Sequence, residues 1–244
     1  VPGAKVTEEI AAIRRVPVGE DCISPPYHRE FGDVDGLIDL VERIAGATGL
    51  PVGIKAAVGE QRFWDDLVAR MAERGEGPDF VTIDGGEGGS GAAPLVFADH
   101  VSLPFRIGFP RVYASFAAAG LADDVVFVGS GKLGLPGNGL MAMALGCDLV
   151  NVGREALLAI GCIQAQRCHT GRCPTGVATQ VPWLVRGLDP DLKSVRCANY
   201  VVALRRELLR LARACGQPHP GYVDLDHLEF VEDPTRSRSA RERF

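Results

Sequence analysis

The sequence lacks the features that would place it in a membrane or on nucleic acid. No apolar run among its 244 residues is long enough to cross a bilayer, and the start VPGAKVTEEI lacks the charged-then-apolar pattern of a signal peptide. Positive charge is not in excess either, since the formal net charge is -5 and nucleic-acid binding depends on a basic face. We therefore expect a soluble cytoplasmic protein that acts on small molecules, without a membrane or nucleic-acid partner.

The composition, 46% hydrophobic and 23% charged, suits one compact globular domain. Seven cysteines in a cytoplasmic protein are expected to be reduced thiols. Closely spaced cysteines would then indicate a metal or catalytic site rather than disulfides.

Short apolar runs alternate with helical patterns through the first 152 residues. Strands are predicted at 16–26, 51–59, 80–83, 125–131 and 148–152, and helices at 5–15, 34–45, 62–74, late in 97–122 and at 139–145. This alternation predicts an α/β fold with a parallel sheet covered by helices. The count is about five strands, whereas a closed (β/α)8 barrel has eight. A further amphipathic helix is predicted at 198–215, followed by a frayed arginine-rich tail.

The sharpest local signal is GCIQAQRCHTGRCPTGVATQ, which contains Cys162, Cys168 and Cys173. Thiolates are the usual ligands of iron-sulfur clusters, and three of them match a cluster that lacks one iron corner. A closed zinc site needs four ligands, and His169 could supply the fourth, so zinc stays an alternative. The other four cysteines are interpreted as ordinary small buried residues: Cys22, Cys147, Cys197 and Cys215.

Two late strands end in small residues next to a cation, GSGK at 129–132 and NVGR at 151–154. In parallel barrels this region often holds a phosphate, because backbone N–H groups can approach its oxygens closely. Turn-forming glycines are the alternative interpretation of either motif alone.

Lys55 ends an otherwise apolar strand, where an unpaired ammonium would be costly to bury. We expect an anion beside it, either a reduced flavin or an oxo-acid, or else the carboxylate of Asp84 or Glu87 as structural support. Asp84 and Glu87 are candidate contacts to a ring or ribityl chain, with surface solvation as the alternative. Gly85 opens a glycine run that suggests close approach to a ligand or a moving loop, so Asp84 and Gly85 count as cofactor-binding candidates.

Six segments occur in a recognisable order: PGAKV, SPPYHRE, GIKAAVG, DGGEGGSGAAP, GSGK and CIQAQRCHTGRCPTGVATQ. Together they resemble the FMN-binding synthase domain of glutamate synthase, from residue 2 to about residue 188. The resemblance implies a (β/α)8 barrel that binds FMN at its C-terminal face. It also implies a 3Fe-4S cluster ligated by Cys162, Cys168 and Cys173.

By the same resemblance, Lys55 matches a lysine near the flavin and 2-oxoglutarate, which makes it the catalytic candidate. The phosphate-binding strands carry Ser130, Gly131, Gly153 and Arg154. The implied oxidoreductase acts on a CH–NH2 group: electrons pass through the cluster to FMN, which reduces the imine of 2-oxoglutarate and ammonia to L-glutamate. The electron donor would be ferredoxin or a nicotinamide-using partner subunit, because no G-x-G-x-x-G fingerprint follows a predicted strand.

The expected domain organisation has residues 1–188 as the C-terminal portion of the barrel, with the iron-sulfur segment at 161–180. Residues 189–230 form a helical extension and 231–244 a flexible tail. In the family the chain would begin partway round the barrel, so either another chain completes it or the chain is a fragment. Two alternatives remain: an electron-transfer module or non-catalytic fragment with the cluster but no complete flavin site, or a related FMN barrel with another substrate.

Overall fold

The computed structural model describes residues 1–25, 27–87, 95–97 and 100–244. The chain divides into two compact units, which are described separately. The sheet unit contains His28–Glu87, Val101–Val152 and Ala203–Phe244, and the cysteine unit contains Val1–Tyr27, Gly88–His100 and Gly153–Val202.

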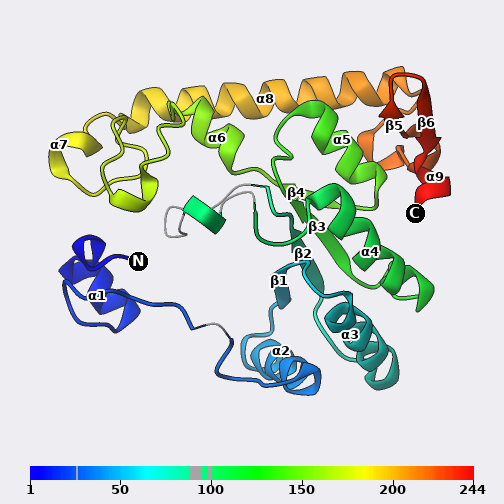
Figure 1. Cartoon of the computed structure of the whole chain (residues 1–244), viewed down its shortest axis with the longest axis horizontal. Coiled ribbons are helices and arrows are strands. Elements are labelled where there is room, and N and C mark those ends of the chain that lie inside the picture. Colours follow the sequence, from blue (N-terminus) through cyan, green and yellow to red (C-terminus); the bar gives the residue numbers. More distant parts are fainter. Residues whose placement is uncertain (26, 88–94, 98–99) are drawn as a thin grey trace. The chain divides into compact units, whose positions relative to one another are not determined.

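The sheet unit is built on four parallel strands in the order β1-β2-β3-β4 (Figure 1). These are β1 (Gly53–Ala57), β2 (Phe80–Asp84), β3 (Val126–Ser130) and β4 (Leu149–Asn151). Their carboxyl ends lie level, because Ala57 pairs with Asp84, Asp84 with Ser130 and Ser130 with Asn151. The α/β class and four of the five predicted strands are thereby confirmed.

Four helices precede or connect these strands: α2 (Val34–Thr48), α3 (Gln61–Arg74), α4 (Phe105–Ala118) and α5 (Pro136–Ala144). Local sequence signals set their limits. The Asp33 carboxylate accepts the Gly36 N–H at 2.8 Å and caps the start of α2, while Gly49 and Gly75 end α2 and α3 in the left-handed conformation.

One face of the sheet forms the core, where Val81, Ile83 and Phe127 are buried among side chains of α3, α4 and α5. Right-handed crossovers between sequential neighbours place every connecting helix on the same face. This is the order of strands and helices within an arc of a (β/α)8 barrel. Over the described residues the sheet is open and has four strands.

The opposite face of the sheet carries residues that stay in contact with solvent. Strand alternation places Lys55, Val126 and Leu149 on this face, and Val126 and Leu149 are 43% and 57% exposed. Val126 and Leu149 are the first residues of β3 and β4. Exposed apolar residues on a parallel sheet are unusual, because parallel sheets are normally covered on both faces.

The C-terminal part consists of α8 (Pro190–Ala214), two 3-10 turns, the hairpin β5 (Glu229–Asp233) and β6 (Arg236–Ser239), and α9 (Ala240–Arg243). The predicted helix at 198–215 is confirmed but begins eight residues earlier. The residues predicted as a frayed tail form part of this hairpin and α9, and the tail arginines pair with acidic residues. Arg238 pairs with Glu232, and Arg241 donates to both carboxylate oxygens of Asp226.

The cysteine unit contains 3-10 turns (Gly3–Lys5, Leu95–Phe97 and Cys168–Thr170), the helices α1 (Glu8–Arg14), α6 (Arg154–Ala159) and α7 (Pro182–Val185), and the first half of α8. The strand predicted at 16–26 is wrong: residues 16–25 form no strand, and Pro26 lies outside the described residues. This segment turns back instead, and the backbones of Val1 and Cys22 exchange two hydrogen bonds of 2.6 and 2.9 Å. No helix in the described part of the chain is long and apolar enough to span a membrane.

Candidate functional site

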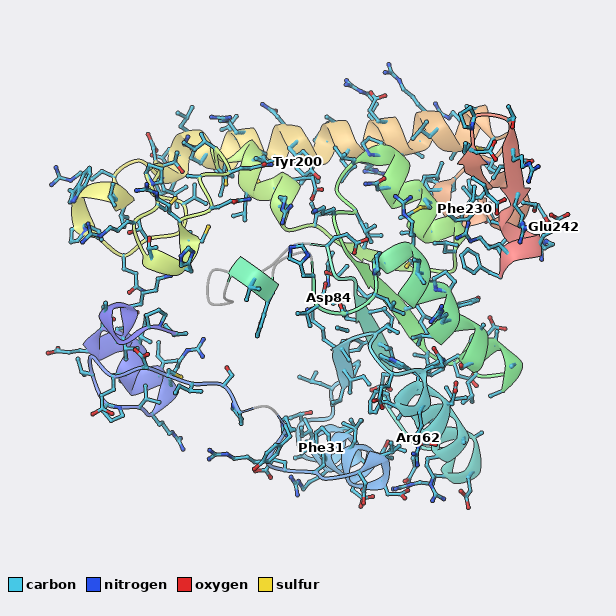
Figure 2. The ribbon with its side chains drawn as sticks, in the orientation of Figure 1. Phe31, Arg62, Asp84, Tyr200, Phe230 and Glu242 are labelled. Carbon is cyan, nitrogen blue, oxygen red and sulfur yellow. The ribbon has the colours of Figure 1, made fainter. Side chains whose placement is uncertain are left out.

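Two opposite charges meet near the carboxyl edge of the sheet. The Lys55 ammonium on β1 donates to Oδ2 of Asp84 on β2, and Figure 2 shows Asp84 at the end of that strand. The two side chains are 56% and 33% exposed, so solvent reaches both. The expected anion beside Lys55 is therefore the Asp84 carboxylate, which was the structural alternative. An exposed pair can also exchange partners with an anionic ligand at little cost, because exposed pairs contribute only about 0–1 kcal/mol.

The Glu87 carboxylate bonds to the backbone at the start of α4. Both of its carboxylate oxygens accept the Phe105 N–H at 2.9 Å, which places a negative charge at the first residue of α4. Close packing within the protein also requires glycine at positions 85 and 86. A Cβ on Gly85 would lie 2.6 Å from the Phe105 nitrogen, and one on Gly86 would lie 2.8 Å from the Ser102 carbonyl oxygen. The rest of the predicted glycine run, 88–91, lies outside the described residues.

The GSGK segment turns sharply at the end of β3. The Ser130 carbonyl accepts the Gly85 N–H at 2.8 Å, which ties the ends of β2 and β3 together. Gly131 has φ of 152°, and its added Cβ would lie 2.8 Å from the Phe105 Cβ. Lys132 follows with φ of 55°, which is rare for a residue with a side chain. Packing against Phe105 therefore explains why position 131 is glycine, which agrees with the interpretation of Gly131 as a turn-forming residue.

The NVGR segment leads from β4 into the cysteine unit. Gly153 is the N-cap of α6, and Arg154 is its first residue. Unlike Gly131, Gly153 has no heavy atom within 4 Å of an added Cβ and has a negative φ of -111°. Neither crowding nor backbone strain among the described residues requires glycine here, and the position that a Cβ would occupy is open.

The three predicted cluster ligands line a single pocket in the cysteine unit. Cys162 follows α6, Cys168 opens a 3-10 turn, and Cys173 follows Gly171, whose φ is 73°. The pocket has a volume of about 220 Å³, with the open solvent at its mouth included. Its lining consists of Cys162, Ile163, Ala165, Gln166, Arg167, Cys168, Cys173, Pro174 and Thr175.

Backbone and hydroxyl groups are arranged to support a thiolate in this pocket. The Gln164 N–H donates to Cys162 Sγ at 3.4 Å, and Cys173 Sγ lies 3.4 Å from the Thr175 hydroxyl. Burial alone would raise the pKa of the Cys173 thiol. Hydrogen bonds from the Thr175 side chain and from the backbone of Ala178, Thr175 and Val177 outweigh it and lower this pKa. Thiolates are the form that binds metal.

The arrangement differs from a closed zinc site. His169, the proposed fourth zinc ligand, is absent from the pocket lining, all of which is described. Within the described ranges, no group of three or more cysteine, histidine or acidic side chains is placed to hold one metal ion. Thiolates around one zinc ion lie about 4 Å apart, because each Zn–S bond is about 2.3 Å long. Cysteines that each bind a different iron of a cluster are spaced more widely.

The structure adds one residue to this site that sequence reasoning missed. The Lys5 ammonium donates to the Cys168 carbonyl, across 163 positions of sequence. PGAKV contributed to the resemblance, but no spacing or pattern in the sequence connects Lys5 to the cysteine segment.

The remaining four cysteines lie apart from the pocket lining, and all seven are free thiols. Cys147 is buried in the core of the sheet unit, and burial, together with the nearby Asp148 charge, raises its thiol pKa. This agrees with its interpretation as a small structural residue. Cys22, Cys197 and Cys215 are half-buried.

Comparison with known proteins gives a consistent result. Residues 1–218 match the conserved region in glutamate synthase. The chain is 40% identical to the glutamate synthase large subunit-like protein YerD of Bacillus subtilis, over 96% of this chain and 44% of that protein. It is 38% identical to the archaeal glutamate synthase [NADPH] of Methanocaldococcus jannaschii, over 88% of this chain and 42% of the relative. It is 33% identical to ferredoxin-dependent glutamate synthase 2 of Synechocystis, over 98% of this chain and 15% of the relative.

Proposed function

Because the chain belongs to the glutamate synthase family, we propose that it supplies the iron-sulfur site and part of the flavin site of an oxidoreductase that forms L-glutamate from 2-oxoglutarate and ammonia. The observation that carries this proposal is the convergence of Cys162, Cys168 and Cys173 on one pocket. The chain spans 44% of the YerD relative, so the complete activity is proposed for the assembled protein.

The donor set of the pocket suits a 3Fe-4S cluster. Three cysteines match three iron corners, and N–H groups aimed at sulfur stabilise thiolate ligands and tune the potential of a cluster. Arg167 lines the same pocket and supplies positive charge near an anionic group. The residues present therefore fit the cluster that the family implies.

For the flavin, we propose that the ends of β3 and β4 hold the phosphate, through Ser130, Gly131, Gly153 and Arg154. The open space where a Gly153 Cβ would lie supports this assignment, because a phosphate oxygen needs close backbone approach. Lys55, in the same proposal, exchanges Asp84 for the flavin or a carboxylate of 2-oxoglutarate and holds that negative charge in place. When bound, FMN would supply the hydride that the reduction requires.

A closed barrel is part of the proposal. The sequential strand order, the helices on one face and the exposed Val126 and Leu149 on the other support a four-stranded arc that further strands complete. Those strands would come from another part of the protein or from another chain. Seven free thiols agree with work in the reducing cytoplasm.

The test is glutamate formation by the complete protein, purified without oxygen and supplied with a reduced viologen, 2-oxoglutarate and ammonia. We expect glutamate in proportion to the iron and flavin content of each preparation. A protein that holds both cofactors but forms no glutamate would contradict the synthase assignment and favour an electron-transfer module or another substrate. Ferredoxin and NADPH, each named for a relative, are then compared as physiological donors.

A further inference from the structure

Lys5 is joined to the central cysteine of the pocket. Its ammonium donates to the Cys168 carbonyl, and its aliphatic stem lies beside Gly171, where an added Cβ would be 3.2 Å from the Lys5 Cε. Gly171 is buried and has φ of 73°. The Lys5 side chain therefore meets the turn between Cys168 and Cys173 at two points, the Cys168 carbonyl and Gly171.

The backbone that carries Lys5 is itself fixed. Lys5 ends a 3-10 turn in which the Val6 N–H donates to the Gly3 carbonyl at 2.8 Å. Gly3 is buried, its N–H donates to the Asp21 carboxylate at 2.6 Å, and a Cβ there would lie 2.2 Å from the Gly19 oxygen. A lysine side chain on an ordered backbone loses less conformational entropy on forming a hydrogen bond than one on a flexible chain.

The acceptor side is equally ordered. The Cys168 carbonyl also accepts the Gly171 N–H at 3.2 Å, and the Thr170 hydroxyl donates to the Arg167 carbonyl at 2.8 Å. The Thr179 hydroxyl donates to the Gly171 carbonyl on the other side of the turn. Lys5 therefore reaches a carbonyl whose position is set by the same turn that presents Cys168.

The cysteine segment itself carries positive charge. Between Glu155 and Asp189 the sequence has no acidic residue, whereas it has three arginines: Arg167, Arg172 and Arg186. The chain as a whole has a net charge of -5. The pocket therefore lies in a segment that contributes cations and no carboxylate of its own.

We propose that Lys5 is a positioning residue for the cluster: it fixes Cys168 through its carbonyl and keeps a positive charge beside the ligands. This inference rests on the proposed cluster in the pocket. A fixed cation beside an anionic centre favours its more negative, reduced form, so Lys5 should raise the reduction potential. It would thereby set how readily the site takes an electron from its donor.

The test is a redox titration of the holoprotein, followed by absorption and electron paramagnetic resonance. For Lys5→Met, at the wild-type midpoint potential, we expect the ratio of reduced to oxidised cluster to fall about tenfold, which is about 59 mV for a one-electron couple. Lys5→Arg keeps the charge and should change the ratio less than about twofold. Arg14→Met is the matched control, because it removes the same charge from an exposed residue of α1 in the same unit.

The outcomes distinguish the role of Lys5 from the proposed function. An intact cluster with an unmoved potential in Lys5→Met, or an equal shift in Arg14→Met, would overturn the role of Lys5 and leave the proposed function in place. Wild-type protein without iron and sulfide would overturn both. If Lys5→Met loses its cluster, Lys5→Gln is measured instead, because glutamine keeps a hydrogen-bond donor without the charge. A lowered reduction potential in Lys5→Gln supports the inference, and an unchanged potential contradicts it.

Discussion

Lys55 of β1 and Asp84 of β2 form an ion pair across neighbouring parallel strands, with the lysine two positions before the residue that pairs with Asp84. Both side chains remain accessible to solvent. The pair thus offers a cation at the carboxyl edge of the sheet without the cost of burying one.

Replacement of Lys55 by methionine should separate stability from function. We expect Lys55→Met to lower the free energy of unfolding by less than about 1 kcal/mol, because the pair is exposed. The kcat/KM for 2-oxoglutarate should fall by about 100-fold or more in the complete protein, because a charged contact to the substrate is lost. Arg43→Met, which breaks the exposed Arg43–Glu30 pair, is the control and should keep full activity. Equal activities in the two variants would refute the role of Lys55.

The two glycines of the proposed phosphate site should respond differently to alanine. Gly131→Ala meets the Phe105 side chain at a positive φ and should cost roughly 2 kcal/mol of stability in a urea titration. Gly153→Ala meets nothing and should cost less than about 1 kcal/mol, while flavin retention falls about tenfold because the Cβ blocks phosphate approach. Unchanged flavin affinity in a folded Gly153→Ala protein would remove this residue from the site.

Cysteine replacements should distinguish pocket from core. Cys173→Ser should lose most of the bound iron, because a thiolate ligand disappears from the pocket. Cys147→Ala, in the core of the sheet unit, should keep its iron and lose roughly 1–2 kcal/mol of stability through the cavity it leaves. Iron analysis and thermal unfolding of both variants make the comparison, and a Cys173→Ser protein with full iron content would contradict the ligand assignment.

One pH effect is expected between α3 and α4. Hydrogen bonds from Ser115 at 2.7 Å and Gln61 at 3.1 Å lower the pKa of Asp65. The ionised carboxylate therefore contributes stability that is present above its ordinary pKa and lost as pH falls through its lowered folded pKa. Asp65→Ala should be less stable than wild type at pH 7, and the gap should shrink toward about pH 3 in urea titrations. A gap that stays constant over this range would show that Asp65 acts by packing alone.

The sequence predicts the sheet well because buried parallel strands are continuous apolar runs, as at 80–83 and 125–131. The error at 16–26 has the same origin: apolar content predicts a strand, but Val18 and Ile23 are 57% and 84% exposed in a segment that bonds back to Val1. The start of α8 at Pro190 could be predicted from the sequence, because an Asp-Pro pair is typical of the beginning of a helix. In the structure the Asp189 carboxylate accepts the Asp191 N–H at 3.0 Å.

The site shows a similar division between local and distant features. Cysteine spacing is local, so the sequence alone brings Cys162, Cys168 and Cys173 together. By sequence Glu87 is a candidate contact to a ligand, with surface solvation as the alternative, yet it accepts the Phe105 N–H, a partner 18 positions away that only the fold reveals. The contact of Lys5 with Cys168 is long-range for the same reason. The hairpin at the C-terminus carries pairings such as Arg238 with Glu232, which a count of charges does not contain.

The assignment of Cys162, Cys168 and Cys173 as ligands of a 3Fe-4S cluster can be tested by metal analysis. The iron, acid-labile sulfide and zinc content of anaerobically purified protein is measured together with its absorption spectrum. We expect three irons and four sulfides for each chain, with negligible zinc and with loss of the iron in Cys173→Ser. Stoichiometric zinc without sulfide, or iron that stays bound after Cys162, Cys168 and Cys173 are all replaced, would contradict it.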